Sequence, residues 1–112
     1  MLFNTKLLNT LTQLNLTEYI EKIKAFNDEY ELKDFASDDN IDIDKFKSFY
    51  ENDKVGFDNF INDYIEYYNL NIKLHNKEIE FGDIKDDFLH KYYMLMICIK
   101  EHQLLNIKVY SD

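Results

Sequence analysis

Apolar residues recur every three or four positions in the first 30 residues, which predicts two amphipathic helices. The first is expected over residues 4–14, and its apolar positions are Leu7, Leu8, Leu11 and Leu14. The second follows closely, with either Asn15 or Thr17 as its N-cap. Its inner face is expected to comprise Tyr19, Ile20, Ile23, Phe26 and Tyr30.

The middle of the chain predicts two more helices. Residues 36–40 have the composition of a loop, and Asn40 or Asp42 can cap a third helix that carries Ile43, Phe46, Phe49 and Tyr50. After a turn near residues 52–56, the polar and apolar residues from Phe57 to Asn69 separate onto opposite helix faces.

The last part of the chain predicts both strand and helix. Alternation at Ile72 and Leu74, and again at Ile79 and Phe81, predicts a β-hairpin around a four-residue loop at 75–78. A long helix is expected over 83–105, and the run 92–99 within it is apolar on every side, which predicts that it lies at the centre of the core. Residues 107–110 alternate again and are expected to add a third strand.

Together these elements predict a mostly helical α+β fold, a single domain over residues 1–112 with four to five helices and a small antiparallel hairpin or three-stranded sheet. Hydrophobic residues make up 46% of the chain, with nine Phe and nine Tyr, enough to form a packed core. The longest apolar run has eight residues, against the ~20 of a membrane span. With no evident secretory signal and one cysteine, Cys98, a cytoplasmic protein is expected.

Acidic residues are concentrated in the middle of the chain. The net charge is -9, and residues 31–66 hold eleven acidic residues and four lysines. On the polar face of the helix that begins at residue 57, Asp58, Asp63 and Glu66 lie in a stretch with no lysine between Lys54 and Lys73, so their mutual repulsion favours a basic partner. A surface that is only solvated is the equally weighted alternative. The candidate partner-binding residues are Asp38, Asp39, Asp42, Asp44, Glu51, Asp53, Asp58, Asp63, Glu66 and Tyr67.

Tyrosine beside acidic residues is typical of protein-binding surfaces. One or two of five tyrosines are expected at the surface, with Tyr67 the first choice; the five are Tyr64, Tyr67, Tyr68, Tyr92 and Tyr93.

Other chemistries are disfavoured, and no cofactor, metal or catalytic residue is expected. The run 38–49 resembles a calcium loop, but Ile43 stands where the loop requires Gly and Phe49 where it requires Glu. Asp86 and His90 have a spacing compatible with one metal, and Asp87 adds a third oxygen, but no second His or Cys is placed to complete a tetrahedral set. Cys98 lies in an apolar run that does not activate a thiol. The chain has no arginine and no basic third, which disfavours direct nucleic-acid binding.

These observations favour a non-enzymatic acidic inhibitor that binds a basic nucleic-acid-binding groove of a host nuclease or defence enzyme, in the manner of DNA mimics and anti-CRISPR proteins. The many residues with AT-rich codons suggest a phage or mobile element as the source. The alternatives are an immunity protein or antitoxin that neutralises a cognate toxin, and a structural or assembly subunit that self-associates through its tyrosines.

Overall fold

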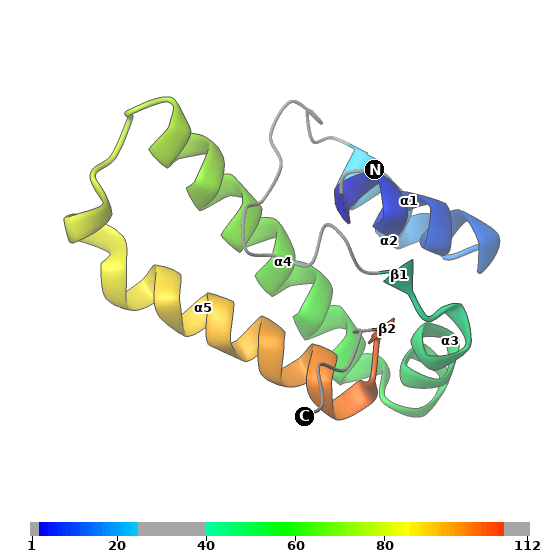
Figure 1. Ribbon diagram of the computed structural model, residues 1–112. Helices are drawn as coiled ribbons and strands as arrows, with labels where there is room; N and C mark the ends of the chain where they lie inside the picture. Colours follow the sequence, from blue (N-terminus) through cyan, green and yellow to red (C-terminus); the bar gives the residue numbers. More distant parts are fainter. Residues whose placement is uncertain (1–2, 25–39, 107–112) are drawn as a thin grey trace.

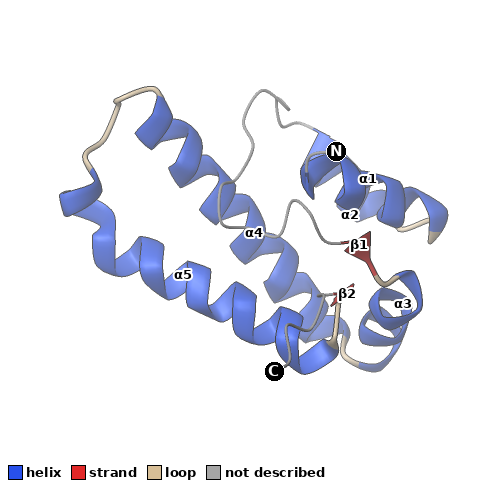
Figure 2. Cartoon of the chain, in the orientation of Figure 1, coloured by secondary structure: helices blue, strands red, loops and turns tan. Residues whose placement is uncertain are grey.

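The computed structural model of the protein describes residues 3–24 and 40–106, which form five helices and two short strands (Figure 1, Figure 2). The elements are α1 (Phe3–Gln13), α2 (Thr17–Lys24), β1 (Asn40–Ile41), α3 (Ile43–Asn52), α4 (Lys54–His75), α5 (Phe81–His102) and β2 (Leu105–Asn106). The predicted mostly helical fold with a small antiparallel sheet is confirmed at this level.

The two N-terminal helices form where the apolar spacing predicts them. Leu7 and Leu11 of α1 are fully buried, as is Ile23 of α2. Asn15 adopts a left-handed φ of 57° in the turn after α1, and the carbonyl of Leu16 accepts the Ile20 N–H at 3.2 Å. Leu16 therefore takes the N-cap position that the sequence assigned to Asn15 or Thr17. The predicted inner-face residues Phe26 and Tyr30 lie outside the described residues.

Side-chain caps set the starts of α3 and α4. Asp42 precedes α3 and its carboxylate accepts the Lys45 N–H at 3.1 Å, which confirms one of the two predicted caps. Asp53 alone separates α3 from α4, and its carboxylate accepts the Gly56 N–H at 2.9 Å. A Cβ atom at Gly56 would overlap this carboxylate, so the glycine leaves room for the cap. The turn predicted at residues 52–56 is thus reduced to one residue.

The predicted hairpin at residues 72–81 is wrong. Ile72 and Leu74 belong to α4, and Phe81 is the first residue of α5. Tyr68 and Ile72 are four residues apart and continue the core-facing side of α4, so two alternating residues do not outweigh the helical pattern before them. The strands lie elsewhere: β1 pairs antiparallel with β2, with Asn40 opposite Asn106. Residues 107–110, predicted as a third strand, lie outside the described residues.

Helices α4 and α5 run antiparallel as the longest pair in the fold, joined by the turn at residues 76–80 (Figure 1). At the opposite end of this pair, α3 contacts both helices. Helix α5 ends at His102 and is capped by Gln103, which has a left-handed φ of 54° and donates its N–H to the carbonyls of Ile99 and Lys100. The first residue of α4 and the last of α5 are thereby placed near α3.

The core is built largely from aromatic rings. Phe57 of α4 packs edge to face against Tyr19, Phe46 and Phe49, with ring centroids 4.9–5.6 Å apart. The buried Tyr64 hydroxyl donates to Oδ1 of the buried Asn4 at 3.0 Å, which joins α1 to α4. These contacts hold α1, α2 and α3 against the first half of α4.

Candidate partner-binding surface

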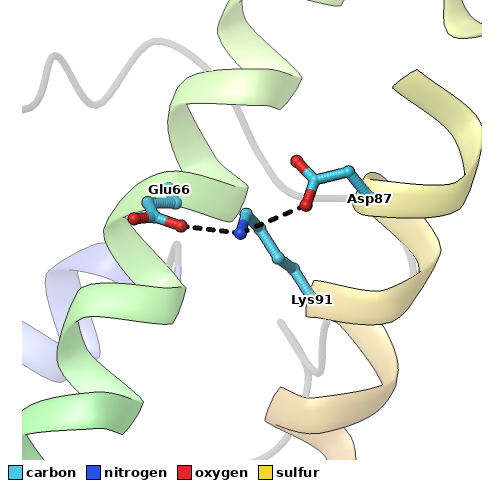
Figure 3. Close-up of polar contacts among 3 residues, drawn as sticks. All are labelled: Glu66, Asp87 and Lys91. Carbon is cyan, nitrogen blue, oxygen red and sulfur yellow. Dashed lines mark ion pairs between the residues drawn. The ribbon is translucent and has the colours of Figure 1, made fainter. Parts of the chain in front are cut away.

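The acidic face predicted on α4 is largely paired within the molecule. Asp58 accepts a hydrogen bond from the Tyr19 hydroxyl of α2. Glu66 forms an ion pair with Lys91 of α5 at 2.7 Å, and Lys91 also reaches Asp87 at 3.4 Å (Figure 3). The expectation that nothing compensates these carboxylates is therefore wrong for two of the three. Their partners come from other helices, which helical spacing along α4 does not reveal.

Burial and hydrogen bonding raise the pKa of the Tyr19 hydroxyl above its usual range, because the neutral phenol is the form that donates to Asp58. The Lys91 ammonium is affected in the same direction: its pKa is raised mainly by the hydrogen bond to Glu66. Both groups hold their protons at neutral pH and remain donors to these carboxylates.

Asp63 differs from its two neighbours on the predicted face. It is half-buried, and this burial raises its pKa against the opposing attraction of Lys91. Glu66 adds a smaller repulsion in the same direction as burial, whereas His90 opposes it. The charged form of Asp63 is therefore less favourable here than in water, and a cation placed beside it would stabilise that form.

The other predicted acidic residues are dispersed. Asp42 and Asp53 are helix caps, whereas Asp44 and Glu51 are exposed on α3. Asp38 and Asp39 lie outside the described residues. Of all the predicted acidic residues, Asp53 and Asp63 line one common cavity.

The prediction that Tyr67 reaches the surface is wrong. Its side chain is 3% exposed and packs against the rings of Phe88 and Tyr92 of α5. Tyr93 is instead 57% exposed. On α4, Tyr67 therefore faces α5, whereas Tyr64 faces Phe3 and Asn4 of α1.

The middle of α5 is also more exposed than its sequence predicts. Leu95 and Ile99 are buried, but Met94 is 45% and Ile97 is 49% exposed. In the described residues, α5 contacts α4 and, near its end, α3, and one side of the apolar run remains uncovered. The expectation that residues 92–99 lie at the centre of the core is therefore wrong for this side of the helix.

A cleft forms where this uncovered side meets the start of α4 and the end of α3. Its volume is about 230 Å³. Apolar groups from α4 and α5 line it, including Phe60, Met94, Ile97 and Cys98. Three carboxylates lie around these groups: Asp53 from the α3–α4 junction, Asp63 from α4 and Glu101 from α5. We call this set of residues the acid-rimmed cleft.

The same three carboxylates also act on Cys98, which lines the cleft. Burial, followed by repulsion from Glu101, Asp53 and Asp63, raises the pKa of the Cys98 thiol to about 12. A thiol in this setting stays protonated at neutral pH, which agrees with the expectation that Cys98 is not a nucleophile. The same three carboxylates produce a negative potential in the cleft that favours a cationic group.

A second cavity of about 350 Å³ adjoins the cleft near the end of α3. Phe49, Asp53, Glu101 and His102 line both. The ring of His102 stacks on Phe49, with centroids 3.8 Å apart and planes 18° from parallel. These stacked rings fix the end of α5 against α3 and so fix the position of Glu101 relative to Asp53.

Sequence reasoning singled out Asp53 and Asp63 but missed Met94, Ile97 and Glu101. These three positions are spaced i, i+3 and i+7 on α5, which places them on one helix face. The signal available in the sequence was the width of the apolar run, since a helix that contacts neighbours on one side cannot bury residues on every side.

Within residues 3–24 and 40–106, no group of three or more His, Cys, Asp or Glu side chains is placed to hold a metal ion. Asp87, a neighbour of the predicted Asp86–His90 pair, contacts Lys91 instead. No helix of the described part of the chain is long and apolar enough to span a membrane.

Comparisons with protein-family models, curated proteins and solved structures found no match to this chain.

Proposed function

We propose that this protein is a non-enzymatic inhibitor that binds a basic nucleic-acid-processing protein in the cytoplasm and covers its nucleic-acid-binding surface. The observation that carries the proposal is the convergence of Asp53, Asp63 and Glu101, from separate parts of the chain, around exposed apolar side chains. Carboxylates in this arrangement complement a basic surface, and the apolar groups add contact area that a nucleic-acid competitor lacks.

The net charge supports the same partner class. At -9 in 112 residues, the chain repels polyanions and attracts basic proteins over distances comparable with the Debye length, about 10 Å at 0.1 M salt. This attraction would accelerate association with a nucleic-acid-binding groove, whose lysines and arginines otherwise contact phosphates. The short apolar cleft then adds contacts that do not depend on salt.

The pairing described above changes which residues a test should alter. Replacing Asp58 or Glu66 would also break contacts with Tyr19 or Lys91, so a loss of inhibition would not report binding alone. Asp53→Asn, Asp63→Asn and Glu101→Gln together remove three charges from the cleft and retain the side-chain shapes. Asparagine also retains the cap of α4. We call this triple substitution the cleft variant.

A matched control is available at the other end of the α4–α5 pair. The turn at residues 76–80 and the start of α5 lie at the end of the α4–α5 pair away from α3 (Figure 1). Glu78, Glu80 and Asp86 belong to these segments and are exposed. Glu78→Gln, Glu80→Gln and Asp86→Asn together change the net charge by the same amount as the cleft variant. We call this substitution the far-end variant.

The test begins with capture of partners from the lysate of an AT-rich bacterium, followed by purification of each captured protein and a competition assay with a labelled duplex oligonucleotide. The proposal predicts that a captured protein binds the duplex and releases it as the inhibitor is added. It also predicts that the cleft variant competes at least about tenfold less well than the far-end variant.

Two results would contradict the proposal. Captured proteins that bind no nucleic acid, with a toxin retained through high-salt washes, would favour the immunity-protein alternative. A complex in which partner and duplex bind together without competition would exclude inhibition by coverage of the nucleic-acid surface.

A further inference from the structure

The exposed apolar residues of the acid-rimmed cleft form a continuous stripe along one face of α5. Met94 and Ile97 lie one turn apart on α5, and Glu101 follows one turn later on the same face. Tyr93, also exposed, precedes Ile97 by four residues and widens the stripe. From Met94 to Glu101 the stripe extends about 10 Å along the helix axis, at 1.5 Å per residue.

The cleft itself is small, with a volume of about 230 Å³. A cavity of this size, lined by Phe60, Met94 and Ile97, suits one or two large apolar side chains. Helices present such side chains on one face, at i, i+3, i+4 and i+7.

The charges around the cleft define what must flank those side chains. Asp53 and Glu101 are exposed at one end, and Asp63 lies along its α4 side, where burial already raises its pKa. Among the described residues lining the cleft there is no lysine. A partner segment with lysine or arginine on either side of its apolar face would therefore place cations beside all three carboxylates.

We infer that the acid-rimmed cleft binds a basic amphipathic helix of the partner protein, which inserts one or two large apolar side chains between α4 and α5 and pairs its flanking lysines or arginines with Asp53, Asp63 and Glu101. The inference rests on the proposed function, since it specifies the partner segment that the inhibitor engages.

The direct test uses two synthetic peptides of 18 residues, both composed of the same numbers of leucine and lysine. In one, the leucines occupy a single helix face; in the other, they are distributed around the helix. Binding is measured by titration and mapped by ¹⁵N amide chemical shifts of the full-length protein. The amphipathic peptide is expected to bind at least about tenfold more tightly and to shift signals of residues 53–63 and 94–101.

Two variants make the mapping decisive. Met94→Ser with Ile97→Ser removes these apolar groups without changing the net charge. Because both side chains are about half exposed, the variant is expected to stay folded, which circular dichroism checks. This double variant is expected to bind the amphipathic peptide about tenfold less well, and the cleft variant is expected to lose as much. The far-end variant is expected to bind as the unmodified protein does.

Equal binding of the two peptides, or shifts centred on the far end of the α4–α5 pair, would overturn the inference. Full binding of the peptide by the Met94→Ser, Ile97→Ser variant would also overturn it. So would light scattering that shows a dimer of the unmodified protein and a monomer of this variant, because the cleft would then bind a second copy of the chain. These failures are distinguishable from failure of the proposed function. If the protein with both serine substitutions still displaces duplex from its partner, the proposed function stands and the inference that the cleft binds an apolar helix face fails.

Discussion

At the scale of single residues, Asp63 shows how a side chain chosen from charge alone acquires a specific environment in the fold. The sequence places it on an acidic helix face, and the structure places it half-buried in the wall of an apolar cleft. Its raised pKa results first from burial, which penalises the charged carboxylate. A residue of this kind lowers stability when charged and contributes binding energy when a cation arrives.

Asp63→Asn is therefore expected to stabilise the free protein at pH 7. Because the folded pKa of Asp63 is raised, the folded state binds more protons than the unfolded state as the carboxyl titrates, so its contribution to stability falls as pH rises through that range. The gain from Asn should be present at pH 7 and absent near pH 3, where the carboxyl is protonated in both states. Urea denaturation at the two pH values measures it, and a loss of stability at pH 7 would contradict it.

Cys98 provides a second test at this scale. With its pKa raised to about 12, the thiol should react with iodoacetamide at pH 8 more than about 100-fold slower than in the urea-unfolded protein. The cleft variant should react faster, because three of the causes of the shift are Glu101, Asp53 and Asp63. Mass spectrometry gives both rates. A folded-state rate equal to the unfolded-state rate would show that the thiol is neither buried nor surrounded by charge.

At the scale of elements, apolar spacing located all five helices because each has a face that must be buried. It failed at residues 72–81, where short alternation was compatible with two structures, and the strands formed between segments more than 60 residues apart. Single-sequence patterns also do not show which side of a helix has a neighbour. Met94 and Ile97 are exposed because their side of α5 has no neighbour in the described residues, and both line the candidate site.

Alanine substitutions on α5 test this division of the helix. Leu95→Ala and Ile99→Ala should each lower the free energy of unfolding by about 2–5 kcal/mol, because both side chains are buried. Met94→Ala and Ile97→Ala should each change it by less than about 1 kcal/mol, because both are roughly half exposed. Urea denaturation compares the four. Equal losses at Leu95 and Ile97 would place residues 92–99 within the core on all sides.

The cap of α4 is tested separately, because Asp53 serves both the helix and the cleft. Asp53→Ala should cost about 1 kcal/mol of stability, since the Gly56 N–H loses its acceptor. Asp53→Asn should cost only a few tenths, since asparagine caps about as well. Thermal unfolding of the two variants measures the difference. An Asn variant as unstable as the Ala variant would mean that the cleft variant is not a clean probe of charge.

At the scale of the whole molecule, the fold converts a diffuse acidic composition into a localised surface. Asp58 and Glu66 are paired with Tyr19 and Lys91, whereas at the end of the α4–α5 pair near α3 three carboxylates surround exposed apolar groups. Charge counting along the chain singled out Asp53 and Asp63 but not Glu101, which lies outside the acidic segment 31–66. It did not separate the carboxylates that hold the fold together from those that face the cleft.

The most direct test of the cleft as the binding surface is the dissociation constant of the purified partner for three proteins: the unmodified chain, the cleft variant and the far-end variant. Each is measured at 50 mM and 300 mM salt. We predict that the cleft variant binds at least about tenfold more weakly at low salt and has a smaller salt dependence, whereas the far-end variant stays within about twofold of the unmodified chain. Equal weakening by both variants would show that net charge alone drives binding, and the cleft would not be the site.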